Sequence, residues 1–136
     1  MKTLLILALI MLSCQAQAQD TDYHLETALT SYHFNRTKGF NENNFGLGET
    51  KNSWAVGYYN NSNRKYSTYA LHSTLYGDSI KYGIVVGVVT GYTIAPIAPM
   101  AGVQIIIPIN KFALNLIAVP TIKNKVHGFI GVQIRY

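Results

Sequence analysis

The stretch VHGFIGVQIRY, residues 126–136, alternates between two kinds of side chain with a period of two. One face of this run carries Val126, Gly128, Ile130, Val132, Ile134 and Tyr136. The other face carries His127, Phe129, Gly131, Gln133 and Arg135. Successive side chains of a β-strand point to opposite sides, so the pattern predicts a strand with one apolar face.

Similar runs precede it along the chain and are separated by turn residues. With the last run they make eight, at residues 23–34, 44–50, 53–60, 66–76, 80–92, 98–109, 111–120 and 126–136. The gaps between them alternate. Those at 51–52, 77–79 and Asn110 are short, whereas those at 35–43, 60–65, 93–97 and 121–125 are longer and mostly polar. This alternation is typical of outer-membrane barrels with both termini in the periplasm.

The composition favours a barrel whose apolar side chains face lipid. Charged residues make up 12% of the chain, whereas soluble domains usually contain about 25%. The longest apolar stretch after residue 18, residues 94–109, contains Pro96, Pro99 and Pro108, which argue against a helix. We therefore predict an all-β fold, an eight-stranded antiparallel transmembrane β-barrel. A soluble β-sandwich or lipocalin-like barrel is the alternative, but it would have to bury more apolar side chains than its core can hold.

The N-terminus predicts export. Lys2 precedes an apolar run of nine residues, Leu4 to Leu12, and Ala16 and Ala18 occupy the two positions that a signal peptidase reads. We predict a signal peptide at 1–18 and an outer-membrane barrel domain at 19–136. The alternative is a lipoprotein signal ending at Cys14. The final aromatic residue resembles the C-terminal signal by which barrels are recognised for insertion into the outer membrane.

Positive charge gathers on the predicted outer loops. These loops carry Arg36, Lys38, Arg64, Lys65, Lys123 and Lys125 against the single acid Glu42. Lysine and arginine bind phosphates through charge-assisted hydrogen bonds, so Arg36, Arg64 and Lys65 are candidate contacts for the phosphates of lipopolysaccharide. The alternative is a set of solvated loops. Nucleic acid is not an expected partner, because these residues would lie outside the cell.

The histidines are the candidate chemical groups. The four, His24, His33, His72 and His127, do not have the spacing of a zinc site, so we expect no metal and no cofactor. His72 lies in mid-strand and is expected to pack inside the barrel. His33 closes the first strand and Ser62 lies in the next outer loop, so both reach the same rim. A histidine and a hydroxyl at one rim can act as a base and its partner in acyl transfer.

Several motifs together resemble the lipid A palmitoyltransferase (PagP) family. They are Tyr32-His33, the run Phe40 to Gly48 (FNENNFGLG), Trp54 to Tyr58 (WAVGY), Asn61-Ser62, and Pro96 with Pro99 to Val103 (PMAGV). Pro120 and the aromatic C-terminus also match, so the resemblance extends over most of residues 31–136. It implies an eight-stranded barrel with an internal pocket for one acyl chain, which members of the family move from a phospholipid to lipid A.

The resemblance assigns the catalytic positions and also shows two departures. His33 matches the family's essential histidine and Ser62 its serine. Asn61 stands where the family has an aspartate, and an amide orients or stabilises a protonated histidine less well than a carboxylate does. Glu42 and His127 are the nearest titratable candidates for that role. In addition, only residues 19–22 precede the first strand, whereas the family usually has an amphipathic helix there.

The expected function is therefore that of a monomeric, membrane-embedded acyltransferase of the outer membrane. It would act on phospholipid and lipid A through His33, Ser62 and Asn61. Two alternatives stay open: a barrel without catalytic activity that shields or remodels the cell surface, and a lipid hydrolase that uses water as the acceptor. The sequence does not give the length of the acyl chain.

Overall fold

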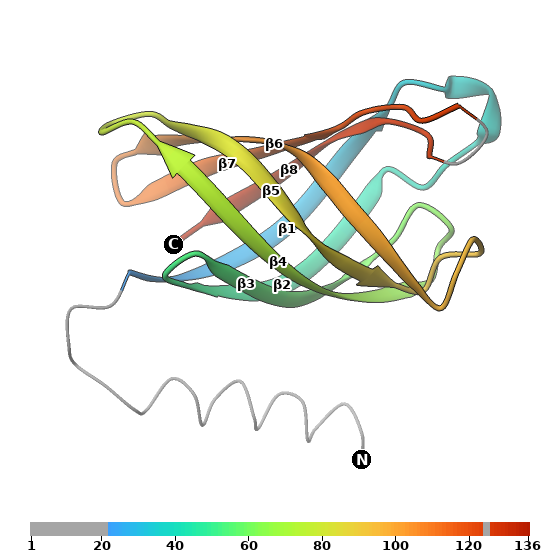
Figure 1. The fold of residues 1–136 in the computed structure, drawn as a ribbon, viewed down its shortest axis with the longest axis horizontal. Helices are drawn as coiled ribbons and strands as arrows, with labels where there is room; N and C mark the ends of the chain where they lie inside the picture. Colours follow the sequence, from blue (N-terminus) through green and yellow to red (C-terminus); the bar gives the residue numbers. More distant parts are fainter. Residues whose placement is uncertain (1–21, 124–125) are drawn as a thin grey trace, which may run out of the picture.

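The computed structural model describes residues 22–123 and 126–136, which form eight antiparallel strands. Each strand pairs with the next, and β8 pairs with β1, so the sheet closes into a barrel (Figure 1). The strands are β1 (Tyr23–His33), β2 (Asn43–Lys51), β3 (Trp54–Asn60), β4 (Tyr66–Tyr76), β5 (Lys81–Thr90), β6 (Ile97–Ile109), β7 (Phe112–Val119) and β8 (Phe129–Arg135). The predicted signal peptide, its cleavage after Ala18 and the alternative at Cys14 lie outside the described residues.

The predicted eight-stranded antiparallel barrel is confirmed, and most strand bounds differ from the prediction by one or two residues. The largest difference is at the start of β8, which begins at Phe129 instead of Val126. Val126 is bonded elsewhere, because its backbone exchanges two 2.9 Å hydrogen bonds with that of Ile122. The alternation of side-chain type in the sequence therefore begins at Val126, before the residue at which β8 starts to pair with its neighbours.

The two ends of the barrel differ in the length of their connections. Asn52, Gly77 and Asn110 have positive φ in the short turns at one end, which we call the turn end. Asparagine and glycine tolerate this backbone conformation best. The longer connections, of which residues 34–42, 61–65, 91–96, 120–123 and 126–128 are described, share the opposite end, which we call the loop end. β1 starts and β8 finishes at the turn end (Figure 1).

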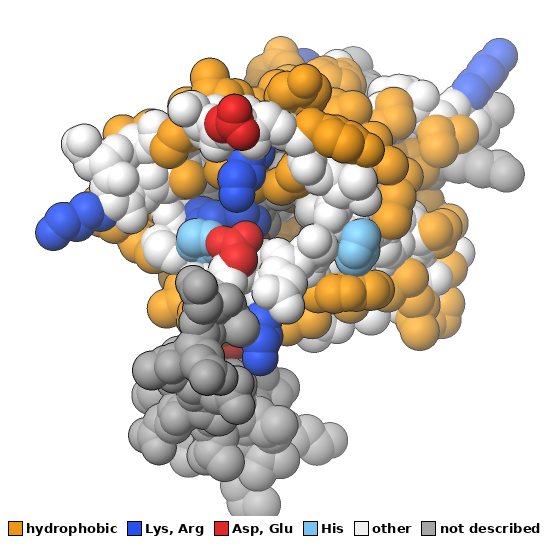
Figure 2. All heavy atoms as spheres, turned by 60° about the vertical axis from the view of Figure 1, so that its left-hand side comes forward, with side chains coloured by type: hydrophobic (Ala, Val, Ile, Leu, Met, Phe, Trp, Pro, Cys, Tyr) orange, Lys and Arg blue, Asp and Glu red, His pale blue; other side chains and the backbone are white. Residues whose placement is uncertain are grey.

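The barrel wall exposes apolar side chains on its outer side. On β5, Ile84, Val86 and Val88 are exposed, whereas the alternate residues Val85 and Val89 are buried. Figure 2 shows hydrophobic side chains spread over much of the visible wall. No helix among residues 22–123 and 126–136 is both long and apolar enough to cross a membrane.

His72 faces outward, so the prediction that it packs inside the barrel is wrong. Its neighbours on β4 fill the inward positions, since Leu71 is buried and Ser73 Oγ donates a 2.6 Å hydrogen bond to buried Gln104. The His72 ring instead makes an edge contact with exposed Trp54 on β3, with ring centroids 4.8 Å apart. The prediction rested on the polarity of His72 alone. Because its neighbours Leu71 and Ser73 point inward, the alternation along the strand predicts that His72 points outward.

Polar side chains fill the lumen towards the turn end. Glu26 of β1 accepts hydrogen bonds from Thr50 Oγ1 at 2.8 Å and from Arg135 Nε at 2.8 Å, and all three residues are buried. A second chain links Gln104, Asn115 and Gln133 across β6, β7 and β8. The Glu26–Arg135 pair joins the two strands whose pairing closes the barrel.

We expect single substitutions of this pair to destabilise the barrel more than the double substitution does. Glu26→Leu or Arg135→Met leaves one buried charge without its partner, which costs about 3–5 kcal/mol. The double substitution removes both charges, so no unpaired charge remains buried in the lumen. Urea-induced unfolding of the reconstituted protein measures the difference. Equal stability of either single variant and the wild type would contradict this prediction.

Candidate functional site

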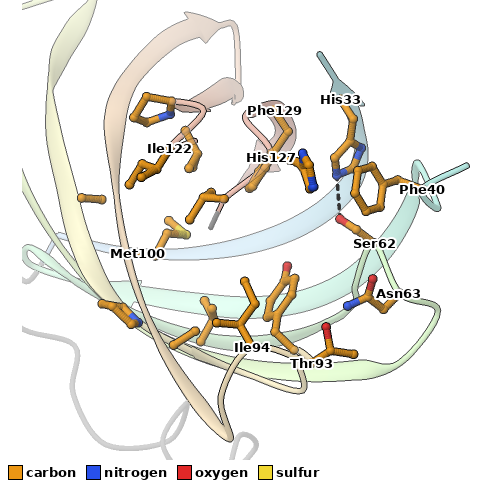
Figure 3. Close-up of a pocket in the computed structure, with 18 of the residues that line it drawn as sticks. His33, Phe40, Ser62, Asn63, Thr93, Ile94, Met100, Ile122, His127 and Phe129 are labelled. Carbon is orange, nitrogen blue, oxygen red and sulfur yellow. Dashed lines mark hydrogen bonds between the residues drawn. The ribbon is translucent and has the colours of Figure 1, made fainter. Parts of the chain in front are cut away.

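His33 lies at the loop end, where β1 finishes, and its side chain is almost fully buried. Its Nε2 lies 2.7 Å from Ser62 Oγ, a hydrogen-bonding distance (Figure 3). The ring packs between two aromatic rings, those of Phe40 and Phe129, with centroids 4.6 and 5.5 Å away. The structure thus brings together the two residues that the sequence predicted at one rim, although 29 positions separate them.

Ser62 is placed by a tightly hydrogen-bonded loop between β3 and β4. The backbone N–H of Asn61 donates to Lys65 O at 2.7 Å, and the N–H of Arg64 donates to Asn61 O at 3.0 Å. From the β1–β2 connection, the N–H of Asn41 donates to Ser62 O at 2.9 Å. These bonds hold the backbone of Ser62 on both sides, so its hydroxyl meets His33 from a fixed position.

The side chain of Asn61 organises this loop and does not contact His33. Its Oδ1 accepts from the backbone N–H groups of Asn63 at 2.8 Å and Lys65 at 3.1 Å. Its Nδ2 donates to Ser67 Oγ and to Gly91 O, both at 2.9 Å. Fully buried, the amide makes four hydrogen bonds and uses both its donors and its acceptor.

This environment gives a physical reason for an amide at position 61. The Ser67 hydroxyl donates to Thr90 O, so it presents only lone pairs to residue 61, as does Gly91 O. A carboxylate cannot donate to either group and would bury a negative charge against two acceptors. The residue type that the resemblance leads one to expect here is therefore incompatible with these surroundings.

Accordingly, Asn61→Asp should destabilise the protein and should not increase any activity of the site. Loss of two donated bonds and burial of a charge should cost roughly 2–4 kcal/mol. Chemical unfolding of the reconstituted protein would measure the loss, with Asn63→Asp on the same loop as the control. A variant as stable as the wild type, or more active, would contradict the assignment.

Glu42, in the connection between β1 and β2, lies beside the other nitrogen of His33. Its Oε1 accepts a 3.0 Å hydrogen bond from the backbone N–H of His33 and lies 3.8 Å from His33 Nδ1. The same oxygen pairs with Arg36, whose guanidinium lies over the ring of Tyr32. The backbone hydrogen bond from His33, with help from Arg36, lowers the pKa of Glu42, which therefore carries a negative charge at neutral pH.

An apolar cavity of about 730 Å³ opens beside the His33–Ser62 pair. Its size falls within the range of roughly 300–1,000 Å³ that is typical of ligand sites. Hydrophobic residues such as Val89, Met100, Val119 and Phe129 line its interior, and Lys38, Phe40 and His127 belong to its wall as well. Figure 3 shows Met100, Phe129, Phe40 and His127 around the cavity beside His33 and Ser62. A group bound in this cavity would have its polar end within reach of His33.

A smaller cavity of about 70 Å³ lies next to the larger one and shares Val89, Met100 and Phe129 with it. Gly131 is part of its lining, and a Cβ atom added there would meet only ordinary contacts, the nearest at 3.6 Å. The two cavities together extend the apolar part of the lumen towards the polar layer at the turn end.

Tyr92, from the β5–β6 connection, adds a hydroxyl to the cavity wall. Its Oη lies 2.7 Å from Tyr59 Oη. Burial raises the pKa of Tyr92, and hydrogen bonding with Tyr59 and Ser62 opposes this only in part. Tyr92 thus stays a neutral hydroxyl next to Ser62.

The basic residues predicted to bind substrate differ in their surroundings. Arg36 is held by Glu42 and Tyr32, and Arg64 Nη1 donates a long 3.5 Å bond to Gly39 O. Lys65 is exposed on the β3–β4 loop. Lys38, which the sequence placed among the rim charges without a substrate role, lines the cavity itself.

The sequence did not identify the apolar residues of the cavity wall such as Val89 and Val119. Phe40 and His127, which the sequence did single out, also line the cavity, and their rings lie tilted against each other with centroids 5.3 Å apart. The motif around Phe40 drew attention to this region, but nothing in the sequence shows that residues from four connections meet around His33. In the described ranges no three His, Cys, Asp or Glu side chains are placed to hold a metal ion.

No model of a known family matches the chain, and a search of curated proteins finds no match.

Proposed function

We propose that this chain is an outer-membrane acyltransferase that moves an acyl chain from a phospholipid to lipid A. The observation that carries the proposal is the contact between buried His33 and half-buried Ser62, 2.7 Å apart, at the mouth of an apolar cavity. Such a cavity suits an acyl chain, and the pair at its mouth suits the ester at the end of that chain. The resemblance of the motifs around both residues supports the same activity.

Membrane insertion is supported by the outer wall. Ile84, Val86 and Val88 of β5 and Val103 and Ile105 of β6 are all exposed, an arrangement that water disfavours and lipid favours. Aromatic side chains stand exposed near both ends, with Trp54, Tyr76 and Phe112 near the turn end and Tyr32, Phe45 and Tyr66 near the loop end. Aromatic girdles at the two interfaces are typical of transmembrane barrels.

A gap in the strand ladder gives a lipid a route from the wall to the cavity. β6 pairs with β7 only from Val103 onward, so residues 97–102 of β6 have no partner on β7. Outward-facing Pro99 and Ala101 of this segment belong to the cavity lining together with Pro120, just beyond β7. Proline has no N–H to donate to a neighbouring strand, which leaves this seam weak.

The chemistry assigned to His33 is that of a general base. A hydroxyl of lipid A gives its proton to His33 Nε2 while its oxygen bonds to the ester carbonyl carbon of the phospholipid. The bond from that carbon to the glycerol oxygen then breaks, and this oxygen takes the proton from His33 and leaves as the lysophospholipid. Acyl chain, electron pair and proton are all accounted for, and no cofactor takes part.

Ser62 has two roles open to it at this distance. As a nucleophile it would first accept the acyl chain as an ester and then pass it to lipid A. As a hydrogen-bond donor it would stabilise the oxyanion formed on the carbonyl oxygen, together with the neighbouring Tyr92. Only the first role produces an acylated protein, which mass spectrometry of the protein during turnover would detect.

The basic residues at the loop end supply contacts for phosphate groups. Lys38 lies in the cavity wall, and Arg64 and Lys65 follow Ser62 along the same loop. These cations would bind the phosphates of lipid A and hold its hydroxyl near His33. Arg36 contributes less to this contact, because Glu42 already engages its guanidinium.

Cells that express the wild-type protein should contain lipid A with one additional acyl chain, and cells that express His33→Ala should not. Ser62→Ala should reduce the transfer at least about 100-fold, in line with loss of a nucleophile or an oxyanion donor. Mass spectrometry of extracted lipid A gives the answer, and His72→Ala, on the outer wall, is the control.

The other outcomes of this experiment separate the alternative functions. Lipid A of unchanged mass together with free fatty acid would show that water is the acceptor. Unchanged lipid A without free fatty acid, for wild type and His33→Ala alike, would contradict catalysis and favour a barrel that shields the surface.

Chain-length preference should respond to the smaller cavity. Gly131→Val should fill that space and shift the preferred acyl chain to a shorter one, with Gly131→Ala giving a smaller shift, because a Cβ at this position has room. Transfer from phospholipids of graded chain length measures the preference. Ile130→Val, on the outer face beside it, serves as the control, and an unchanged preference in Gly131→Val would exclude the smaller cavity from the binding site.

A further inference from the structure

His33 has one ring nitrogen engaged and one without a partner. Nε2 contacts Ser62, whereas Nδ1 is the single buried side-chain polar atom among the described residues that has no hydrogen-bond partner. Buried polar atoms are nearly always bonded, so an orphan in a histidine at a candidate site calls for a functional explanation. If Ser62 donates to Nε2, the proton of the neutral ring is on Nδ1 and points away from Ser62.

A carboxylate stands near that nitrogen and is held in place. Glu42 Oε1 lies 3.8 Å from Nδ1, which is beyond hydrogen-bond length but close enough for a strong charge interaction. The backbone N–H of His33 itself donates to the same oxygen, so the carboxylate is tied to the residue whose ring it faces. Catalytic hydrogen bonds are often long in an empty site and shorten when substrate binds.

We propose that Glu42 is the positioning residue for His33 and takes the role for which residue 61 is unsuited. This rests on the proposed function, since it assigns a group to the same reaction. When His33 receives a proton at Nε2, its ring becomes a cation with an N–H at Nδ1 directed at Glu42. The carboxylate stabilises that cation and fixes the ring orientation that leaves Nε2 towards the hydroxyl.

Neighbouring charges make the position of Glu42 matter. Burial of the ring disfavours a positive charge on His33 most strongly, and the nearby charges of Arg36 and His127 disfavour it further. Glu42, in contrast, favours this charge. Its pairing with Arg36 also offsets part of the effect of that cation on His33.

The test combines a titration with a rate measurement on the full-length protein in detergent micelles. Glu42→Gln keeps an oxygen that can accept from the His33 backbone but removes the charge. NMR titration of the His33 ring should show a pKa lower in Glu42→Gln than in the wild type, because the cation loses its counter-charge. Arg36→Gln should shift the pKa in the opposite direction, and Glu49→Gln, near the turn end, should leave it unchanged.

The rate measurement shows whether the contact serves catalysis. Glu42→Gln should lower kcat for acyl transfer roughly 10- to 1,000-fold with little change in KM, and should move the pH–rate profile with the pKa of His33. Glu42→Asp restores the charge and should therefore recover part of the rate. If the role of Glu42 were purely structural, restoring the charge would not be required for activity.

The two arms separate failure of this proposal from failure of the proposed function. A His33 pKa that is the same in wild type and Glu42→Gln would overturn the role of Glu42 even if acyl transfer is observed. A shifted pKa with an unchanged kcat would overturn it as well. If the wild-type protein transfers no acyl chain, the function proposed above fails, and the titration still decides whether Glu42 acts on His33.

Discussion

Closure of the sheet between β1 and β8 sets the distances at both ends of the barrel. β1 pairs with β2 on one side and β8 on the other, with His33 opposite Phe129 at the loop end and Glu26 opposite Arg135 at the turn end. The first of these pairings puts the aromatic wall of the cavity beside the candidate base. The second buries an ion pair between β1 and β8. Because β1 takes part in both pairings, the polar layer in the lumen and the candidate site at the loop end are built on the same strand.

Two different residues hold the Ser62 loop and place a negative charge near His33. Asn61 holds the loop that presents Ser62, and it does so with the donors of an amide, which a carboxylate lacks. A negative charge near His33 comes instead from Glu42, on the connection that follows β1. The amide at position 61 therefore does not face His33, and the carboxylate near the ring is that of Glu42, on the side of Nδ1.

The sequence predicted the eight strands, the closed antiparallel barrel and the alternation of short and long connections, because a period of two and turn residues are local signals. It also predicted that His33 and Ser62 share a rim, which follows from the order of strands. It could not predict the four hydrogen bonds of the Asn61 side chain or the distance from Glu42 to Nδ1, since these depend on how three loops fold against one another. The prediction for His72 was wrong because a polar residue in mid-strand was assumed to point inward. Its neighbour Leu71 is buried, and adjacent side chains of a strand face opposite sides, so His72 lies on the outer side.

Transfer of an isotope-labelled acyl chain inside vesicles is the most direct test of the account. Purified protein would be reconstituted with phospholipid carrying the label and with unlabelled lipid A, and both lipids would be analysed by mass spectrometry over time. If the barrel transfers acyl chains, the label should appear in lipid A at the rate at which lysophospholipid is formed. Label that stays in the phospholipid, with the barrel correctly folded in the vesicle, would contradict the proposed transfer.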